Sequence, residues 1–331
     1  MYALRFDMRA PAGFTPAPTL YRAALEMAEW ADSHGGLAIT ICEHHASPDG
    51  YLPAPLLMAA AVAARTKRIP IRVGAVIASL RQPVQLAEEM AVLDILSERR
   101  ASFVLALGYR QVEFDLYGIP FAERVRRFEA AIETIQAAFR GEALPGVDPS
   151  VRATPAPETP GGPLVTLGGS SRAAVRRAAR YGLGMITEKP GLEDAYRAAC
   201  AERGIEPGPF FEAPRHAVTV AFVAPDPDAA WERLGPHLLH DAQTYARWNA
   251  DAGKTGLDAI IAADDADGLR KAGHPYRVFT PDEAVEHIRT VGPLSLAPLC
   301  GGAPPELGWS TLHAIVEDVV PRVQAAAKEP A

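Results

Sequence analysis

The sequence has few cysteines and no long apolar run. Its three cysteines, Cys42, Cys200 and Cys300, are odd in number and far apart in the 331 residues, which argues against a disulfide framework and favours a reducing compartment. The longest apolar run, residues 55–64, is far shorter than the ~20 residues of a membrane-spanning helix. Charged residues interrupt the N-terminal segment, where an export signal requires an apolar core. We therefore expect a cytoplasmic protein.

The chain also lacks an excess of positive charge. It has 33 Lys and Arg against 40 Asp and Glu, a net charge of −7, so no global basic field attracts nucleic acid or an anionic membrane. No GxGxxG, GxxxxGK(S/T), HxH or HExxH motif occurs. With 48% hydrophobic and 22% charged residues, the composition is that of a globular protein with a large core, and a small molecule is the expected partner.

Apolar strand segments alternate with helical segments along the chain. Residues 69–78 are apolar continuously rather than alternately, which indicates a strand buried on both faces of a parallel sheet. Eight strand–helix units favour an α/β fold of the (β/α)8 TIM-barrel type, a single domain over residues 1–331. Residues 108–119 are expected to form a loop, and insertions are predicted after the fourth helix (141–163) and between the seventh and eighth strands (251–276). The predicted strands are residues 3–8, 37–42, 69–78, 102–107, 164–167, 184–187, 216–223 and 294–299.

Ionisable residues gather at the end of the second predicted strand. Residues 39–41 are mostly β-branched, and Glu43, His44 and His45 follow them before a Pro-Asp-Gly turn. In barrels of this type, chemistry lies at the C-terminal ends of the strands. A histidine there is often only a hydrogen-bonded structural residue, but its ordinary pKa of about 6.5 also suits proton transfer. Because side chains alternate along a strand, we expect at most one of the two histidines to be catalytic.

A glycine- and serine-rich turn joins the fifth predicted strand to a helix. Gly168 and Gly169 let a ligand approach the backbone closely, and Ser170 and Ser171 offer hydroxyls at the helix start, where main-chain amides attract an anion. The turn therefore predicts a phosphate site, to which Arg172 adds positive charge. The alternative is that one serine is only an N-cap, the glycines form a tight turn and the arginine lies on a solvated face.

Residues after two other strands are further candidates for ligand binding. Gly108, Tyr109 and Arg110 follow the fourth strand, with Glu113 one turn further on. A tyrosine and an arginine at a barrel mouth stack on a ligand or form an ion pair with it, although Arg110 is equally suited to pair with Glu113 or Asp115. Arg81, just past the third strand, is another basic candidate. The alternative for Arg81 is a charge that merely leads the next helix.

Five stretches of the sequence together resemble successive blocks of the luciferase-like monooxygenase family, the bacterial luciferase superfamily. In this order and spacing, the resemblance covers nearly the whole chain. The stretches are EHHASPDGYLPAPLLMAAAVAARTKRI, VGAVIASLRQPVQLAEEMAVLDILSERR, LALGYRQVEFDLYGI, LGGSSRAAVRRAARYG and the closing PLCGGAPPELGW.

Members of that family are (β/α)8 barrels that bind reduced FMN or the deazaflavin coenzyme F420 at the C-terminal mouth. The resemblance implies that His44 is the active-site histidine, with Glu43 beside it as the second catalytic candidate. It also implies that Glu113 lies near the flavin and that Ser171 contacts the phosphate. Leu107 stands where flavin-binding members commonly have arginine, so FMN and F420 are both retained as expected cofactors.

The resemblance further implies that the third strand backs the isoalloxazine ring, often through a non-proline cis peptide, which is a strained and functionally placed bond. Cofactor contacts are then expected from the ends of the third, fourth and fifth strands. The predicted cofactor-binding residues are Ala75, Val76, Ile77, Gly108, Tyr109, Arg110, Glu113, Gly168, Gly169, Ser170, Ser171 and Arg172.

The activity that the resemblance implies is oxidation of a small organic substrate by a monooxygenase that uses reduced FMN and O2. One alternative is an F420-dependent oxidoreductase that transfers hydride, and another is a non-catalytic flavin-binding partner subunit. A metal-dependent barrel hydrolase using His44, His45 and Asp49 is a third, although two metal ligands from one strand usually stand at i and i+2 rather than side by side. A separate flavin reductase and a second copy of the chain, in a homodimer, are the expected protein partners.

Overall fold

The computed structural model describes residues 1–254, 257 and 260–326. The chain divides into two compact units. We call residues 1–40, 47–53 and 216–331 the terminal unit, and residues 41–46 and 54–215 the central unit. No helix among the described residues is long and apolar enough to cross a membrane.

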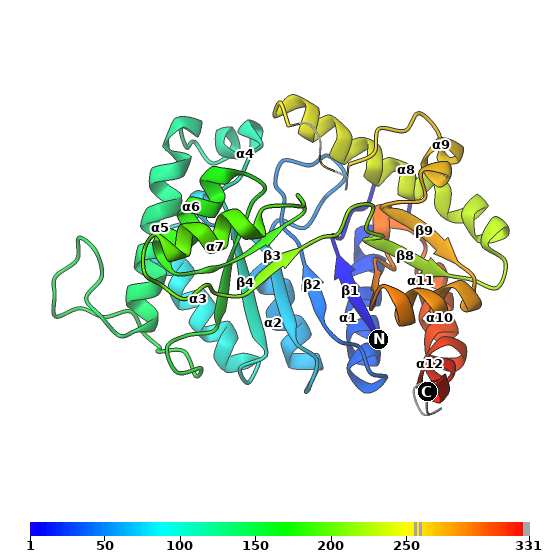
Figure 1. Cartoon of the computed structure of the whole chain (residues 1–331), viewed down its shortest axis with the longest axis horizontal. Helices are drawn as coiled ribbons and strands as arrows, with labels where there is room; N and C mark the ends of the chain where they lie inside the picture. The colour runs from blue at the N-terminus through cyan, green and yellow to red at the C-terminus, as the bar shows by residue number, and fades with distance from the viewer. Residues whose placement is uncertain (255–256, 258–259, 327–331) are drawn as a thin grey trace. The chain divides into compact units, whose positions relative to one another are not determined.

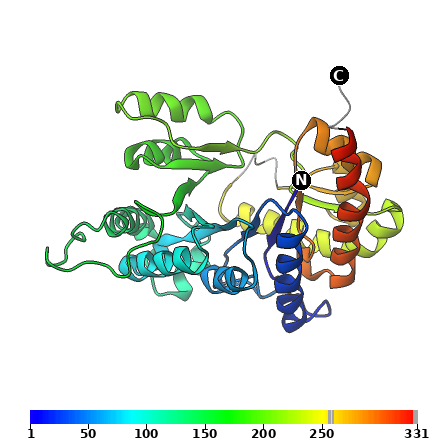
Figure 2. The same ribbon diagram turned by 90° about the horizontal axis from the view of Figure 1, so that it is seen from below.

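The central unit is built on parallel strands that pair in chain order. Helix α3 packs against α2 and α5 (Figure 1), and α6 packs against α7 (Figure 2). The strands are β3 (Ile71–Ile77), β4 (Ala101–Ala106), β5 (Leu164–Gly168), β6 (Gly184–Thr187) and β7 (Phe210–Glu212). The helices are α2 (Pro55–Arg65), α3 (Pro83–Leu96), α4 (Gln111–Leu116), α5 (Arg124–Phe139), α6 (Arg172–Tyr181) and α7 (Glu193–Ala201), with short 3-10 turns at Ala78–Leu80 and Phe121–Glu123.

The terminal unit contains the parallel strand order β1-β10-β8-β9. In Figure 1, α8 packs against α9 and α10 packs against α12. Strand β2 (Ile39–Ile41) begins in this unit and ends in the central one. The other strands are β1 (Tyr2–Phe6), β8 (Val220–Val223), β9 (Tyr276–Phe279) and β10 (Leu294–Leu296). The helices are α1 (Ala17–Ser33), α8 (Pro227–Asp251), α9 (Ala266–Ala272), α10 (Pro281–Thr290), α11 (Pro305–Ala314) and α12 (Val320–Ala326), with a 3-10 turn at Cys300–Gly302 and a π-helical turn at Ile315–Val319.

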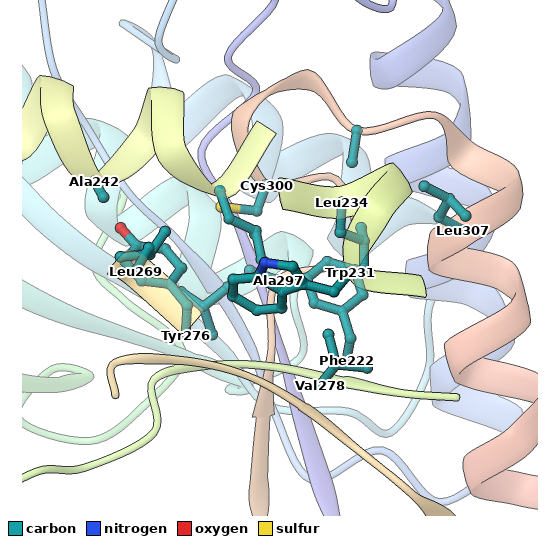
Figure 3. Close-up of a cluster of buried hydrophobic side chains, with 13 residues drawn as sticks. Phe222, Trp231, Leu234, Ala242, Leu269, Tyr276, Val278, Ala297, Cys300 and Leu307 are labelled. Carbon is teal, nitrogen blue, oxygen red and sulfur yellow. The ribbon is translucent and has the colours of Figure 1, made fainter. Parts of the chain in front are cut away.

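An apolar stripe on α8 forms the core of the terminal unit. Trp231, Leu234 and Leu238 recur at helical spacing and are at most 5% exposed. They belong to one buried cluster with Phe222 of β8 and Val278 of β9 (Figure 3). Fully burying an apolar side chain of this size contributes ~1.5–3 kcal/mol. Packing of this stripe therefore anchors α8 to the sheet.

A buried arginine holds the 47–53 segment within the terminal unit. The Arg9 side chain is 0% exposed; its Nη1 donates to Asp49 Oδ2 at 2.5 Å, and its Nε lies 2.9 Å from Asp241 Oδ1. Three aromatic rings have their centroids 4.7–4.9 Å from the guanidinium carbon, within cation–π range. These rings belong to Tyr51, Tyr245 and Trp248. One cation thus joins the end of β1, the 47–53 segment and α8.

Asp7, beside this arginine, gives the terminal unit a predicted pH dependence. Burial, with a further contribution from Asp241, raises the pKa of Asp7 from 3.8 to about 6 against the opposing charges of Arg9 and Arg5. The folded state therefore binds more protons than the unfolded state between these values, and the free energy of unfolding falls as pH rises through that interval. Asp7→Asn should flatten this slope in urea titrations at pH 4.5 and 7. An unchanged slope would contradict the prediction, and the exposed Asp194→Asn is the control.

The α/β alternation expected from the sequence is confirmed, but the number of strands differs. Each of the eight predicted strands overlaps an observed one, whereas β7 and β9 were not predicted. Strand β7 has only three residues and lies in a proline-rich segment, and β9 begins at the end of the 251–276 insertion. The loop predicted at residues 108–119 contains α4, and residues 141–163 contain no helix or strand. The single domain over residues 1–331 stays a prediction.

Candidate active site

One carboxylate oxygen gathers the residues that follow β2 and β4 in the central unit. Glu113 Oε1 lies 2.8 Å from Nδ1 of His44. The same oxygen accepts hydrogen bonds from the main-chain N–H of His45 at 3.0 Å and from Nη1 of Arg110 at 3.0 Å. Glu113 is 0% exposed and lies in the first turn of α4. The sequence neighbours His44 and His45 therefore converge, through different groups, on one buried oxygen.

The charge of Glu113 determines how the His44 ring is oriented. Burial raises the pKa of Glu113, but the hydrogen bond and charge of His44, the N–H of His45 and the charge of Arg110 together outweigh burial and leave the pKa below its ordinary value. An ionised carboxylate only accepts hydrogen bonds, so His44 donates through Nδ1–H and a neutral ring carries its lone pair on Nε2. The other oxygen, Glu113 Oε2, is buried and has no hydrogen-bond partner among the described residues.

His45 is held at both ring nitrogens. Its Nε2 lies 2.7 Å from Glu43 Oε1, and its Nδ1 lies 3.1 Å from the Tyr117 hydroxyl. The side chain is 4% exposed. Its main-chain oxygen accepts a 2.7 Å hydrogen bond from Arg110. His45 is thus bound to protein groups at both ring nitrogens, at its N–H and at its carbonyl.

Glu43 connects the segment after β2 to the end of β3. Its Oε2 accepts a hydrogen bond from the main-chain N–H of Ile77 at 2.8 Å, and its Oε1 accepts one from Arg81 at 2.7 Å as well as bonding His45. These contacts use both carboxylate oxygens of a side chain that is 1% exposed. The geometry of Glu43 is therefore that of a residue that positions its neighbours.

The end of β3 has a bulge instead of the expected cis peptide. Its register against β4 shifts between Val73 and Val76, and a bulge redirects side chains locally. The cis peptide bonds in the described chain precede Pro155 and Pro275, so the non-proline cis bond expected at residues 75–77 is not found. Ala75 is partly buried, and Val76 and Ile77 are buried.

The residues after β4 pack tightly against this segment. Gly108 has φ +77°, and a Cβ there would lie 2.9 Å from both the Ile77 side chain and the Phe114 ring, so only glycine fits. The Tyr109 ring stands edge-on to the His44 ring at 5.7 Å. Arg110 is buried and pairs with Glu113. This pairing was one of the alternatives expected for it from the sequence. Backbone geometry thus brings residues 108–110 to the histidine.

The turn after β5 has the contacts of a capped helix start. Ser171 Oγ accepts from the N–H of Ala174 at 3.2 Å, which makes it the N-cap of α6. A Cβ on Gly169 would lie 2.7 Å from that of Ala174, Gly168 ends β5, and Ser170 accepts a long, 3.4 Å hydrogen bond from Thr187. Ser171 therefore has the N-cap role that was the alternative to a phosphate contact. Arg172 is exposed on the first turn, and a phosphate site at this turn stays a prediction.

The three residues of the metal-hydrolase alternative have other partners. His44 bonds to Glu113 and His45 bonds to Glu43. Asp49, in the terminal unit, bonds to Arg9 and to His240 at 2.8 Å. These pairings favour proton-transfer or structural roles for the histidines over metal ligation.

Sequence reasoning missed Tyr117 and the role of Arg81. Tyr117 follows Glu113 by four residues, the spacing that places two side chains on one face of a helix. That signal was hidden because residues 108–119 were interpreted as a loop. Arg81 was considered as a ligand contact, but it is an ion-pair partner of Glu43.

Parallel strands that alternate with helices make this chain an α/β protein, and its solved structural neighbours place it in the (β/α)8-barrel class. The model of the luciferase-like monooxygenase family matches residues 4–295. The chain therefore belongs to that family.

Three characterised relatives are 30–32% identical to parts of the chain. The 4-hydroxyprotoasukamycin monooxygenase of Streptomyces nodosus subsp. asukaensis is 32% identical over 134 residues, 40% of this chain and 35% of that protein. The oxygenase component of the flavin-dependent trigonelline monooxygenase of Acinetobacter baylyi is 31% identical over 125 residues, 37% and 35% of the two chains. An alkanal monooxygenase beta chain of Photorhabdus luminescens is 30% identical over 185 residues, 54% and 56%. The matches thus span about a third to just over half of these relatives.

Solved structures match the chain over almost its whole length. Monooxygenase RslO1 from Streptomyces bottropensis has a TM-score of 0.76 at 22% identity, covering 97% of this chain and 99% of that one. The oxygenating constituent of 3,6-diketocamphane monooxygenase from Pseudomonas putida, in complex with FMN, has 0.70 at 19%, covering 97% and 98%. An F420-dependent secondary alcohol dehydrogenase has 0.66 at 15%, covering 98% and 99%. At these identities the likeness establishes the fold.

Proposed function

We propose that this protein is a flavin-dependent monooxygenase that uses reduced FMN and O2 to oxidise a small organic substrate, with His44 as its proton-transfer group. The observation that carries the proposal is the buried, ionised Glu113, which fixes His44 through Nδ1. A histidine oriented in this way by a carboxylate is the usual arrangement of a general acid or base. Family membership and monooxygenase relatives support the same reaction class.

The residues present fit a bound flavin. Glu113 Oε2 is a buried acceptor with no hydrogen-bond partner among the described residues, and an isoalloxazine N–H is a donor of the kind it requires. The start of α6, with Ser170, Ser171 and Arg172, would hold the phosphate. Tyr109, edge-on to His44, is an aromatic group that would contact the ring system. We infer that residues 75–77 and 108–110 complete the cofactor site.

The protein's own contribution is to orient, bury and move a proton. Reduced FMN, when bound, supplies the electrons with which O2 is activated. His44 accepts or donates a proton at Nε2 while Glu113 stabilises the charged ring through Nδ1–H. Arg110 and the N–H of His45 keep Glu113 ionised in its buried position. Glu43, proposed from the sequence as catalytic, acts here through His45, Arg81 and Ile77.

An F420-dependent hydride-transfer enzyme is the second candidate. The similar fold of the F420-dependent secondary alcohol dehydrogenase and the presence of Leu107 where flavin-binding relatives commonly have arginine favour it. His44 would then serve as the acid or base beside the hydride path. The likeness to an oxygenase component supports a separate flavin reductase as a partner for the FMN reaction; the homodimer, the cytoplasmic location and the partner-subunit alternative stay predictions.

Anaerobic calorimetry with reduced FMN and reduced F420, each titrated into the purified protein, tests the cofactor. Selective binding of reduced FMN supports the monooxygenase. Selective binding of reduced F420 would favour the hydride-transfer enzyme over the monooxygenase. If the protein binds neither cofactor, both proposals are contradicted.

Ser171 allows a sharper test of the phosphate site. Ser171→Asp keeps an N-cap oxygen for the Ala174 N–H but places a negative charge where the phosphate is proposed, and Ser171→Asn is its neutral control. We expect both variants to have the same urea midpoint of unfolding as the wild type. Ser171→Asp should weaken FMN binding at least tenfold, ~1.4 kcal/mol, while riboflavin, which lacks the phosphate, binds all three proteins equally. Equal FMN affinity in all three would assign this turn to helix capping alone.

A further inference from the structure

We propose that His45 is a positioning residue: its side chain is clamped so that its main chain holds Glu113, and Glu113 in turn sets the orientation of His44. The inference rests on the proposed function, in which His44 transfers the proton. We call Glu43, His45 and Tyr117 the clamp. All its contacts lie within the central unit.

Hydrogen bonds rather than packing alone fix the His45 ring. Glu43 bonds Nε2 at 2.7 Å and the Tyr117 hydroxyl bonds Nδ1 at 3.1 Å. Beside the ring lies a cavity of about 220 Å³, lined in part by these three residues, Arg81 and Gln85. Because space adjoins the ring, loss of either hydrogen bond leaves His45 room to rotate.

The main chain of His45 transmits this restraint to the catalytic pair. Its N–H donates to Glu113 Oε1 at 3.0 Å, and its carbonyl accepts from Arg110 at 2.7 Å, while Arg110 also bonds that Glu113 oxygen. The next residue, Ala46, has φ +49°, a left-handed conformation that alanine adopts only when surrounding contacts impose it. The clamp thus holds the residue directly before this left-handed position.

A movement of the His45 backbone changes His44 by a definite route. Glu113 Oε1 carries three hydrogen bonds, so losing the one from His45 frees this oxygen to shift relative to Nδ1 of His44. The Nδ1–H form of the neutral ring is favoured by that contact. His44 would then populate both tautomers, and Nε2 would carry the ring proton in part of the molecules.

Three variants separate the parts of the clamp. His45→Gln retains a nitrogen donor at the position of Nε2 for Glu43, Tyr117→Phe removes only the hydroxyl, and His45→Ala removes both ring contacts. Tyr181→Phe, which removes a 2.9 Å hydroxyl hydrogen bond to Glu133 elsewhere in the central unit, is the matched control. Ring ¹⁵N shifts of His44 in ¹⁵N-histidine-labelled protein report its tautomer, and steady-state kinetics report kcat and KM.

We expect the Nδ1–H tautomer of His44 in the wild type, the control and, largely, His45→Gln, with a mixture in His45→Ala. The kcat of His45→Ala should fall about 10- to 100-fold at nearly constant KM, as for a misplaced catalytic group, with Tyr117→Phe intermediate. A wild-type His44 spectrum in His45→Ala, with or without loss of kcat, overturns the proposal. If His45→Ala fails to fold, His45→Leu, which fills more of the same space without either ring contact, replaces it, and a wild-type His44 spectrum in that variant overturns the proposal. The spectra decide this even if wild-type protein shows no turnover with any flavin, a result that would contradict only the proposed function.

Discussion

His44→Ala should reduce turnover by about two to four powers of ten, the typical contribution of a general acid or base. Deletion of the ring removes the group that accepts or donates the proton and leaves Glu113 with its bonds to His45 and Arg110. Because Glu113 keeps these two hydrogen bonds, folding should be retained. Stopped-flow and steady-state kinetics with reduced FMN, O2 and a converted substrate, alongside thermal unfolding, measure both effects.

Two further variants make the His44 result specific. Glu113→Gln keeps the shape of the side chain but removes the charge that selects the Nδ1–H tautomer, so its turnover should lie between those of the wild type and His44→Ala. His313→Ala removes an exposed histidine that hydrogen-bonds to Glu317 at 3.0 Å and should leave turnover unchanged. Wild-type turnover in His44→Ala would remove this histidine from the mechanism. Equal losses in His44→Ala and His313→Ala would indicate a general effect on the protein.

The placement of the candidate site was predictable because it depends on local signals. A β-branched strand followed by Glu43, His44 and His45 predicts ionisable groups at a strand end, and the structure has β2 at residues 39–41. Alternation predicted different roles for the two histidines, and they do bond to different carboxylates, Glu113 and Glu43. Local pattern therefore predicted where these ionisable groups lie along the chain but not which groups they contact.

The pairings themselves could not be derived from the sequence. His44 and Glu113 are 69 positions apart, and Glu43, directly beside His44, was the nearer carboxylate to choose. The geometry instead assigns Glu43 to His45 because a carboxylate two residues back lies on the same side of an extended chain. Helix α4, on which Glu113 and Tyr117 depend, was missed because six residues give too little periodicity to be recognised.

The two strands that the sequence did not predict, and the bulge in β3, depend on the surrounding chain and not on a pattern within the strand. Strand β7 lies in a proline-rich segment, and β9 begins at the end of the polar 251–276 insertion, so the surrounding composition did not indicate a strand at either place. A bulge between Val73 and Val76 depends on pairing with β4, which no feature within the strand encodes. Tertiary contacts, rather than local propensity, determine these features.

Arg9→Ala should destabilise the protein by ~3–5 kcal/mol, because it leaves two buried carboxylates without their cation. Asp49 and Asp241 are 6% and 0% exposed. Burial raises the pKa of Asp49, but its hydrogen bond from His240, the charge of Arg9 and further hydrogen bonds from Ser47 and Arg9 hold it well below the ordinary value. The carboxylate is therefore ionised at neutral pH in the wild type, and the substitution removes the buried cation that balances its charge. Urea unfolding at pH 7 measures the change.

Arg9→Lys tests whether charge alone accounts for the stability. Lysine retains the cation but not the planar group that pairs with both Asp49 and Asp241 and lies among the rings of Tyr51, Tyr245 and Trp248. The loss of stability in Arg9→Lys should therefore be intermediate. Arg233→Ala, which removes a 3.4 Å surface pair with Glu306, should cost at most ~1 kcal/mol. Equal destabilisation by Arg9→Ala and Arg233→Ala would show that the buried cation adds nothing beyond a surface pair. Equal stability of Arg9→Lys and the wild type would instead make the guanidinium geometry irrelevant and leave charge as the only contribution.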